Sequence, residues 1–284
     1  MRTICKPLAV ALLLLAGAAP GADDAHLLKR KAFPEAGKGV VIQQTKTQSG
    51  TVKVFDADGK LAREQKTDVL DEELFTRTVV DKGDGRPKKF KQVFDRATYK
   101  NGDVSVPKPH QGYTLIYTLK DGKYEAGTDS ETDLSAEYLA ALGQRVNTPA
   151  LEELVLPRKA VKAGESWAID LKELARTFGE DTRLNEAKSK GEARLVKVYD
   201  KDGKKFGVIE VKMALALTRL GKAMADPPLA ADFRGTLDLV IDGTGTAAKV
   251  SLAGTIKGKL KTDTGMTVEM DSALTSEEEY SAEK

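Results

Sequence analysis

Two stretches of the chain, KVFDADGK at residues 53–60 and KVYDKDGK at residues 197–204, place aspartates beside a glycine. Such loops could bind calcium, which takes about six to eight oxygen ligands. An EF-hand loop with glycine at its sixth position needs a carboxylate at its twelfth, where the two stretches have Gln65 and Ile209. The same letters suit a hairpin, built on a type I turn, in which glycine adopts a left-handed conformation and aspartate accepts backbone hydrogen bonds. We therefore interpret both stretches as turns.

The two copies agree at six of their eight positions, which leaves a duplicated domain as the alternative to two independent turns. The residues that follow them differ, so we favour independent turns. Further turn signals occur at residues 81–85, 120–123 and 242–245. Turns in both halves of the chain predict many antiparallel strands.

Other groups that could carry catalysis or bind a metal are sparse. Cys5 is the only cysteine, and His26 and His110 are the only histidines. We expect His26 to be disordered near a processed amino terminus and His110 to be solvated in a proline-rich loop. The stretch GESWA at residues 164–168 lacks the second glycine of a nucleophile elbow. We therefore predict no cofactor, no metal site and no enzymatic activity; a hydrolase that uses paired carboxylates is a remaining alternative.

Alternating apolar and polar residues are clearest in the carboxy-terminal third. The segment AKVSLAGTIKGKLKT at residues 248–262 has this pattern, which predicts a strand with one buried face. Residues 209–217, 237–241 and 266–274 alternate in the same way, so we predict four long strands in a meander. The predicted buried face of the first segment carries Val250, Leu252, Gly254, Ile256, Gly258 and Leu260.

The amino-terminal half alternates less regularly, and its candidate strands cover residues 40–48, 51–56, 74–81, 88–95 and 113–119. In the middle of the chain the period changes to that of helices.

Three short helices are predicted there. Asp133 caps the first, which ends at Gly143; Thr148-Pro149 starts the second; Asp170, with Glu173 three residues later, caps the third. Polar residues 180–191 are predicted to be a loop, and residues 222–232 a loop or lid.

These patterns predict a mainly β (α+β) protein, in which a curved antiparallel sheet or half-barrel of long meander strands carries a few short helices. We assign residues 1–22 to a signal peptide, 23–37 to a flexible amino-terminal segment and 38–284 to a single β-rich domain. Within that domain, residues 38–132 hold the amino-terminal strands, 133–190 a helical and loop region, and 191–280 the carboxy-terminal meander.

The signal peptide is indicated by Arg2 and Lys6, an apolar run at residues 8–19 and small residues before a cleavage site after Gly21 or Ala22. The run is shorter than the roughly 20 residues that span a bilayer, so we expect no permanent anchor. Because Cys5 precedes the run, we expect neither a lipid attachment there nor a disulfide in the mature chain. The predicted location is the periplasm or the extracellular space.

The charge balance argues against nucleic acid as a partner. The chain has 45 Lys and Arg against 43 Asp and Glu, and two of the cations, Arg2 and Lys6, fall in the signal peptide. The mature chain would therefore be neutral, whereas nucleic-acid-binding domains are strongly basic. The basic stretch GRPKKFK at residues 85–91 is interpreted as a solvated hairpin end.

The stretch LPRKAVKAGESW at residues 156–167 resembles a segment of uncharacterised exported β-rich bacterial proteins. The strand-rich halves around a helical middle are broadly similar to the curved half-barrels of periplasmic lipoprotein carriers. These resemblances imply a fold and supply no catalytic residue.

Ligand-binding candidates are Trp167, Gly254 and Gly258; the alternative is that Trp167 fills the core and the glycines bend the sheet. The predicted function is non-enzymatic binding of a hydrophobic or amphipathic ligand, such as a lipid, by an exported soluble protein. A structural or partner-binding module of the cell envelope is the alternative, and its protein partner is not specified by the sequence.

Overall fold

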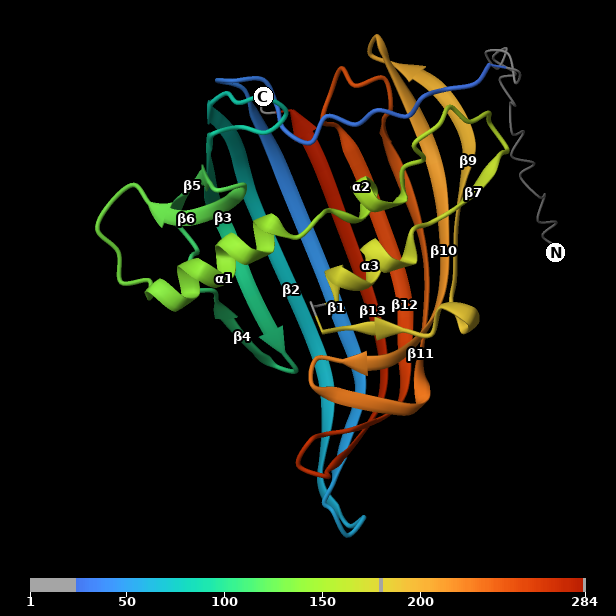
Figure 1. Ribbon diagram of the computed structural model, residues 1–284. Helices are drawn as coiled ribbons and strands as arrows, with labels where there is room; N and C mark the ends of the chain where they lie inside the picture. Colours follow the sequence, from blue (N-terminus) through green and yellow to red (C-terminus); the bar gives the residue numbers. More distant parts are fainter. Residues whose placement is uncertain (1–23, 179–180, 283–284) are drawn as a thin grey trace, which may run out of the picture.

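The computed structural model of the chain describes residues 24–178 and 181–282. Within these residues, thirteen antiparallel strands form one sheet, and three α-helices lie in the segment between β6 and β9 (Figure 1). This confirms the predicted mainly β fold with a curved antiparallel sheet. Cys5 and the predicted signal peptide lie outside the described residues.

The first part of the sheet precedes the helices and consists of β1 (Gly39–Phe55), β2 (Leu61–Asp81), β3 (Lys89–Asn101), β4 (Val104–Pro107), β5 (Thr114–Lys120) and β6 (Lys123–Thr128). The middle of the chain contains α1 (Ala136–Asn147), α2 (Leu151–Val155), β7 (Ser166–Ala168), α3 (Leu171–Thr177), β8 (Arg183–Leu184) and the 3-10 turn η1 (Glu186–Lys188). The remaining strands are β9 (Lys190–Lys201), β10 (Lys204–Leu220), β11 (Ala223–Val240), β12 (Ala248–Lys261) and β13 (Thr267–Ala282).

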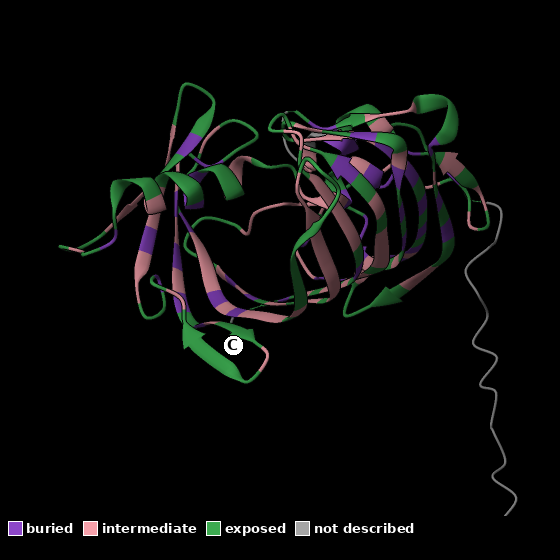
Figure 2. Ribbon diagram, turned by 90° about the horizontal axis from the view of Figure 1, so that it is seen from below, coloured by how far each residue is buried: buried purple, intermediate pink, exposed green. Residues whose placement is uncertain are grey.

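The strands form a meander whose two ends meet in the middle of the sheet. The order is β6-β5-β3-β2-β1-β13-β12-β11-β10-β9-β7, with β4 beside β3 and β8 beside β10. The pairing of β1 with β13, from Val40 opposite Ala282 to Phe55 opposite Thr267, joins the two halves. The sheet bends into a U, and the helices lie across its open side (Figure 2).

The concave face of the carboxy-terminal half forms an apolar core. Alternate residues of β10, from Ile209 to Leu217, have at most 4% of their surface exposed. The helix α3 covers this face with Leu174, and Phe178 after it packs against Phe233 of β11 with ring centroids 6.0 Å apart. On β12, Val250 and Leu260 are buried and lie in this core, with Leu252 and Ile256 packed against it, as the alternation predicts.

The two similar stretches form hairpin turns at opposite ends of the sheet, and the turns differ. In the first, Asp56 Oδ1 accepts from the backbone N–H groups of Asp58 (3.0 Å) and Lys60 (2.8 Å), and Gly59 has φ of 79°. In the second, Asp202 and Gly203 form a two-residue turn with φ of 52° and 71°. The predicted type I geometry thus fits only the first copy; the second has the positive φ values of a type I′ turn.

The first helix differs from the prediction at both ends. Its N-cap is Ser135, whose Oγ accepts from the N–H of Tyr138 (3.1 Å), whereas Asp133 accepts a hydrogen bond from Tyr113. Gly143 does not end the helix. It lies inside α1, where a Cβ would come within 3.1 Å of the carbonyl oxygen of Tyr124, so glycine allows the helix to approach β6 closely.

The other two helices follow the prediction more closely. The second helix starts at Leu151, two residues after Pro149. The predicted cap of the third is confirmed, because Asp170 Oδ1 accepts from the N–H groups of Lys172 and Glu173.

Two segments predicted as loops belong to the sheet. Within residues 181–191, β8 pairs with β10, η1 follows and β9 begins at Lys190. The many polar residues there predict a loop, but two of them, Thr182 and Ser189, are buried. Residues 223–232 are part of β11; Ala223, Met224 and residues 229–232 pair with β10, with an irregularity between Met224 and Leu229. Neither a loop nor a lid is formed by this strand.

The segment predicted to be flexible, described from residue 24 onward, has buried contacts. His26 forms a two-way backbone pair with Val161, at 2.8 and 2.9 Å, so the expectation of a disordered histidine is wrong. Leu28 is 5% exposed, and the Phe33 ring lies 5.2 Å from that of Phe90. This segment closes one end of the space between sheet and helices.

Candidate functional site

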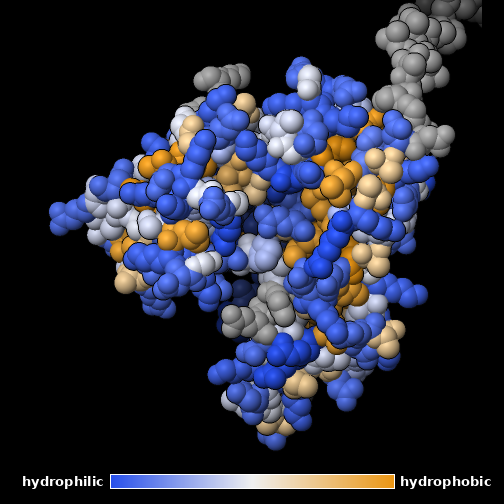
Figure 3. Space-filling model, turned by 45° about the horizontal axis from the view of Figure 1, so that its top comes forward, coloured by the Kyte–Doolittle hydropathy of each residue, from blue (hydrophilic) through white to orange (hydrophobic). Residues whose placement is uncertain are grey.

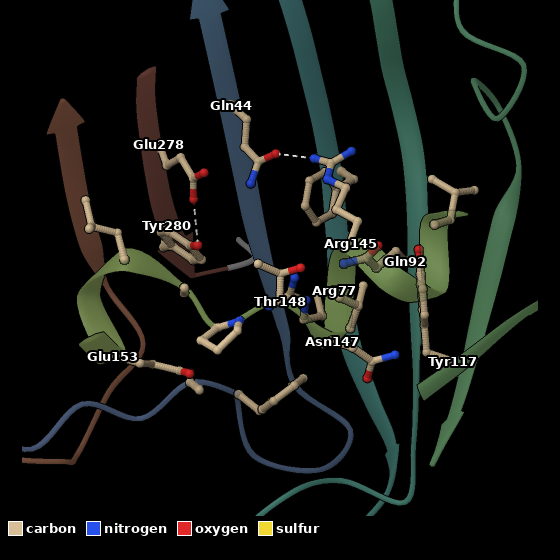
Figure 4. A pocket seen from close by; sticks show the side chains of 18 of the residues that line it. Gln44, Arg77, Gln92, Tyr117, Arg145, Asn147, Thr148, Glu153, Glu278 and Tyr280 are labelled. Carbon is tan, nitrogen blue, oxygen red and sulfur yellow. Dashed lines mark hydrogen bonds between the residues drawn. The ribbon is translucent and has the colours of Figure 1, made fainter. Parts of the chain in front are cut away.

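The candidate site is a cavity of about 620 Å³ between the concave face of the amino-terminal half and the helices; we call it the upper cavity. Its floor is formed by β1, β2, β3, β5 and β13, and its roof by the end of α1, the link to α2 and residues 30–33. Figure 4 shows side chains from these elements converging on one space. Its wall contains both aromatic and charged side chains. The aromatic ones are Phe33, Phe75, Phe94, Tyr117 and Tyr280, and the charged ones are Arg30, Lys46, Arg77, Arg86, Arg145, Glu153 and Glu278.

A buried ionic network holds α1 over the sheet at one side of this cavity. Glu73 of β2 is 1% exposed. Its carboxylate accepts two hydrogen bonds from Arg145 of α1, at 2.8 and 2.6 Å, and one from Lys108 at 2.7 Å. Burial acts to raise the pKa of Glu73, but the contacts with His110, Arg145 and Lys108 outweigh it and hold the pKa far below its usual value. Glu73 is therefore a permanent anion that positions α1.

His110 belongs to the same network, and the prediction of a solvated loop histidine is wrong. It is 1% exposed, its Nδ1 lies 2.6 Å from the hydroxyl of Tyr138, and its Nε2 lies 3.5 Å from Glu73 Oε1. The ring packs edge-on against Phe94 with centroids 4.4 Å apart. The proline-rich loop therefore folds inward beneath α1.

A second buried ion pair joins the amino-terminal segment to α2. Arg30 pairs with Glu152, and both side chains are 5% exposed or less. Burial raises the pKa of Glu152, while the charge of Arg30 opposes this rise. The guanidinium of Arg30 also lies 4.9 Å from the centre of the Tyr280 ring.

Arg77 of β2 occupies a different environment within the upper cavity. Its guanidinium lies 5.5, 5.9 and 5.6 Å from the ring centres of Phe33, Phe75 and Phe90. With the Gln92 amide oriented to satisfy its neighbours, the Gln92 oxygen accepts from Arg77 Nη2 (2.9 Å) and Nε (3.1 Å). Burial lowers the pKa of Arg77, because desolvation disfavours the charged form.

A second cavity of about 440 Å³ follows the upper cavity along the same strands; we call it the lower cavity. Lys46 of β1 lines both. Residues of five further strands form most of its wall, which is largely apolar: Val69, Tyr99, Phe233, Leu252 and Leu274. The concave face thus passes from a charged and aromatic region to an apolar one.

The sequence candidates lie outside both cavities. Trp167 packs against the core, and its Nε1 donates to the carbonyl of Val155 (2.7 Å). A Cβ on Gly254 would lie 2.2 Å from Phe233 Cδ1, and one on Gly258 would lie 2.8 Å from Leu229 Cδ2. The two glycines therefore make room for side chains of β11. This placement matches the core-filling and packing alternative more closely than direct ligand contact.

Trp167 also borders a space of about 760 Å³ along the β7–β9 edge. Its wall includes outward-facing Lys212 and Asp232 as well as inward-facing Met213 and Phe233. Because these residues lie on opposite faces of the sheet, this space is not a single enclosed site. Apolar side chains gather on this side of the molecule, whereas the centre of the same view is mostly hydrophilic (Figure 3).

The inward-facing residues Glu73 and Arg77 were missed in the sequence. The signal was present, because positions 69, 71, 73, 75, 77 and 79 share one face of a strand. Charges at three of these positions hid the alternation of apolar residues.

Among the described residues, no helix is long and apolar enough to cross a membrane, and no group of three or more His, Cys, Asp or Glu side chains is placed to hold a metal ion.

Comparison with known proteins gives distant structural likeness only. No protein-family model and no curated protein matches the chain. A lipovitellin structure, described by its lipid-protein interactions, has a TM-score of 0.36 and 7% identity over 88% of this chain, which spans 25% of the lipovitellin chain. A mutant porin of Rh. blastica has a TM-score of 0.29 and 11% identity over 84% of this chain and 99% of the porin. At such TM-scores neither likeness bears on function, which is inferred below from the two cavities.

Proposed function

We propose that the protein binds an amphipathic ligand between its concave face and its helices, without catalysing a reaction on it. The observation that carries this proposal is a pair of cavities that follow one another along one set of strands. The upper cavity, about 620 Å³, offers charged and aromatic groups, and the lower cavity, about 440 Å³, is largely apolar. Both volumes fall in the range of about 300–1,000 Å³ found for small-molecule sites.

The inward-facing acids support a binding role over acid–base catalysis. Glu73 is held ionised by Lys108 and Arg145, so it has no proton to donate. Glu152 has a raised pKa but pairs with Arg30 and is only 3% exposed. Glu278 accepts a hydrogen bond from the Tyr280 hydroxyl (2.9 Å). Each of these acids has a partner that fixes structure.

We further propose that the chain is exported and acts in the periplasm or outside the cell. The basis is the charge, apolar run and small residues of segment 1–22. Amino-terminal sequencing of protein recovered from the native host would begin at residue 22 or 23. An intact amino terminus in the cytosol would overturn this part of the proposal.

Binding is tested by extracting protein purified from its natural compartment with organic solvent and identifying the released molecules by mass spectrometry. We expect an amphiphile in near-stoichiometric amount. Substitution Leu274→Trp should fill the lower cavity and reduce the amount retained, whereas Ala273→Trp, on the exposed face of the same strand, should not.

Absence of any extracted ligand, together with no thermal stabilisation by added amphiphiles, would contradict the proposal. Recovery of a cross-linked protein partner in that case would favour the partner-binding module instead.

A further inference from the structure

Several inward-facing cations of the amino-terminal half have carboxylate partners. Arg30 pairs with Glu152, Arg145 with Glu73, and Lys108 with both Glu73 and Asp71. Among the described residues, no carboxylate lies within 4 Å of the Arg77 guanidinium. A cation withdrawn from water without a counter-ion is costly, and proteins pair such groups or coordinate them. Lys46 and Arg86 line the same cavity without such a partner in the described part of the chain but are exposed to solvent, so Arg77 is the partly buried inward cation that lacks a close counter-ion; Glu278 acts on it only at longer range.

The contacts of Arg77 leave one edge of its guanidinium available. The Gln92 oxygen occupies the edge formed by Nε and Nη2, and three aromatic rings flank the group. No hydrogen bond is formed by Nη1 within the described residues. The edge formed by Nη1 and Nη2 has the geometry that binds a carboxylate or phosphate through two parallel hydrogen bonds.

Tyr117 adds a second donor to the same wall. Its hydroxyl accepts a hydrogen bond from the Gln92 amide (3.1 Å), which leaves its own hydrogen to donate. Burial raises the pKa of Tyr117, so the hydroxyl keeps this hydrogen at neutral pH. Gln92 thus orients both Arg77 and Tyr117.

The acids of the upper cavity do not occupy this position. Glu278 is bound to Tyr280, and Glu153 is an exposed residue of α2 at the rim. The roof of the cavity contributes aliphatic side chains, Leu142, Val146 and Leu151. A ligand there would meet the Arg77 guanidinium beside aromatic and aliphatic side chains, with Arg30, Arg86 and Arg145 in the same wall.

We propose that Arg77 binds the anionic head group, a carboxylate or a phosphate, of an amphipathic ligand whose apolar part lies against the aliphatic roof and extends past Lys46 into the lower cavity. Gln92 is the positioning residue and Tyr117 the second donor. This inference rests on the proposed function and adds the charge class of the ligand. The alternative is a purely structural Arg77, stabilised by its three aromatic neighbours.

The experiment measures binding of four probes that share one alkyl chain: dodecanoate, dodecyl phosphate, dodecanol and dodecylammonium. Each is titrated into the delipidated mature protein below its critical micelle concentration, with isothermal calorimetry as the readout. We expect the two anionic probes to bind at least about tenfold more tightly than dodecanol, and dodecylammonium to bind most weakly. The tighter of the two anionic probes identifies the head group as carboxylate or phosphate.

Arg77→Met keeps much of the side-chain volume and removes the charge, so it should abolish the preference for anions while dodecanol binds unchanged. Arg96→Met changes an exposed arginine of β3 and is the matched control. Arg77→Lys keeps the positive charge but lacks the two parallel N–H donors of a guanidinium, so it should retain part of the preference for anions. If Arg77→Met does not fold, the affinities of the four probes for the native protein still show whether an anionic head group is preferred, and Arg77→Lys shows whether Arg77 binds it.

Equal binding of dodecanol and the anionic probes would overturn the anionic head group and leave amphiphile binding intact. A preference for anions that survives Arg77→Met would overturn the assignment to Arg77. Binding of none of the four probes would contradict the proposed function itself.

Discussion

The two halves of the sheet bury different chemistry on the same concave side. In the carboxy-terminal half, β10 and β11 present apolar residues that α3 covers, and the space beneath α3 is filled. In the amino-terminal half, β2 presents Asp71, Glu73 and Arg77 among apolar residues, and α1 is held by ions. The difference separates two tasks within one continuous sheet. The filled half supplies a rigid wall, and the charged half leaves room beside a helix whose position is fixed by specific pairs.

Breaking the ionic network should have the largest effect on stability. Glu73→Gln leaves Arg145 without its carboxylate partner and Lys108 with Asp71 alone, so we expect the free energy of unfolding to fall by about 3–5 kcal/mol. Chemical denaturation followed by circular dichroism measures it. The control Glu64→Gln, on an exposed part of β2, should change stability by less than about 0.5 kcal/mol. Equal effects of the two substitutions would show that the network does not hold the amino-terminal half.

Truncation in the filled half should cost nearly as much through a different mechanism. Leu237→Ala removes a side chain that is 1% exposed in the core of β11, and we expect a loss of about 2–5 kcal/mol from lost burial and the cavity left behind. This loss should be independent of salt and pH, unlike that of Glu73→Gln. Denaturation at low and high ionic strength compares the stability losses of the two variants. If both losses depended on salt to the same extent, the contrast between the halves would be removed.

This contrast also explains what could be predicted from the sequence. Alternation in residues 248–262 shows a strand with one buried face because its inward residues are apolar or glycine. In β2 the inward face includes three charged residues, so the same periodicity is not visible as hydrophobicity. The position of His110 depends on contacts with Glu73 and Tyr138, which are 37 and 28 residues away in the chain. Local patterns contain no information about such pairs.

The difference in pH dependence should be smaller than the total effect of Glu73. Its folded-state pKa is lowered, so its stabilising contribution is complete above the unfolded value of about 4.5 and is lost as the pH falls below that value. At pH 3 the native protein should have lost about 2 kcal/mol more than Glu73→Gln, relative to pH 7. Urea unfolding of both proteins across this range measures the difference. Parallel curves would show that Glu73 titrates alike in the folded and unfolded states.

The smallest expected effect concerns the carboxy-terminal half, where β12 pairs with β11. A Cβ added at Gly254 would lie 2.2 Å from Phe233 Cδ1 and 2.4 Å from the carbonyl oxygen of Asp232. Gly254→Ala should therefore cost about 1–3 kcal/mol through overpacking. Gly127→Ala, whose nearest contact would be 4.0 Å away, is the control and should be near neutral.

A second substitution separates ring packing from backbone strain at Gly254. Phe233→Leu combined with Gly254→Ala should recover part of the loss, because the shorter side chain leaves the space that the ring occupied. The double variant should also bind less amphiphile, since Phe233 lines the lower cavity. Thermal denaturation and calorimetric titration of the native protein, Gly254→Ala, Phe233→Leu and the double variant test both effects. If the two substitutions are strictly additive in stability, the glycine is required by the strand backbone rather than by the ring.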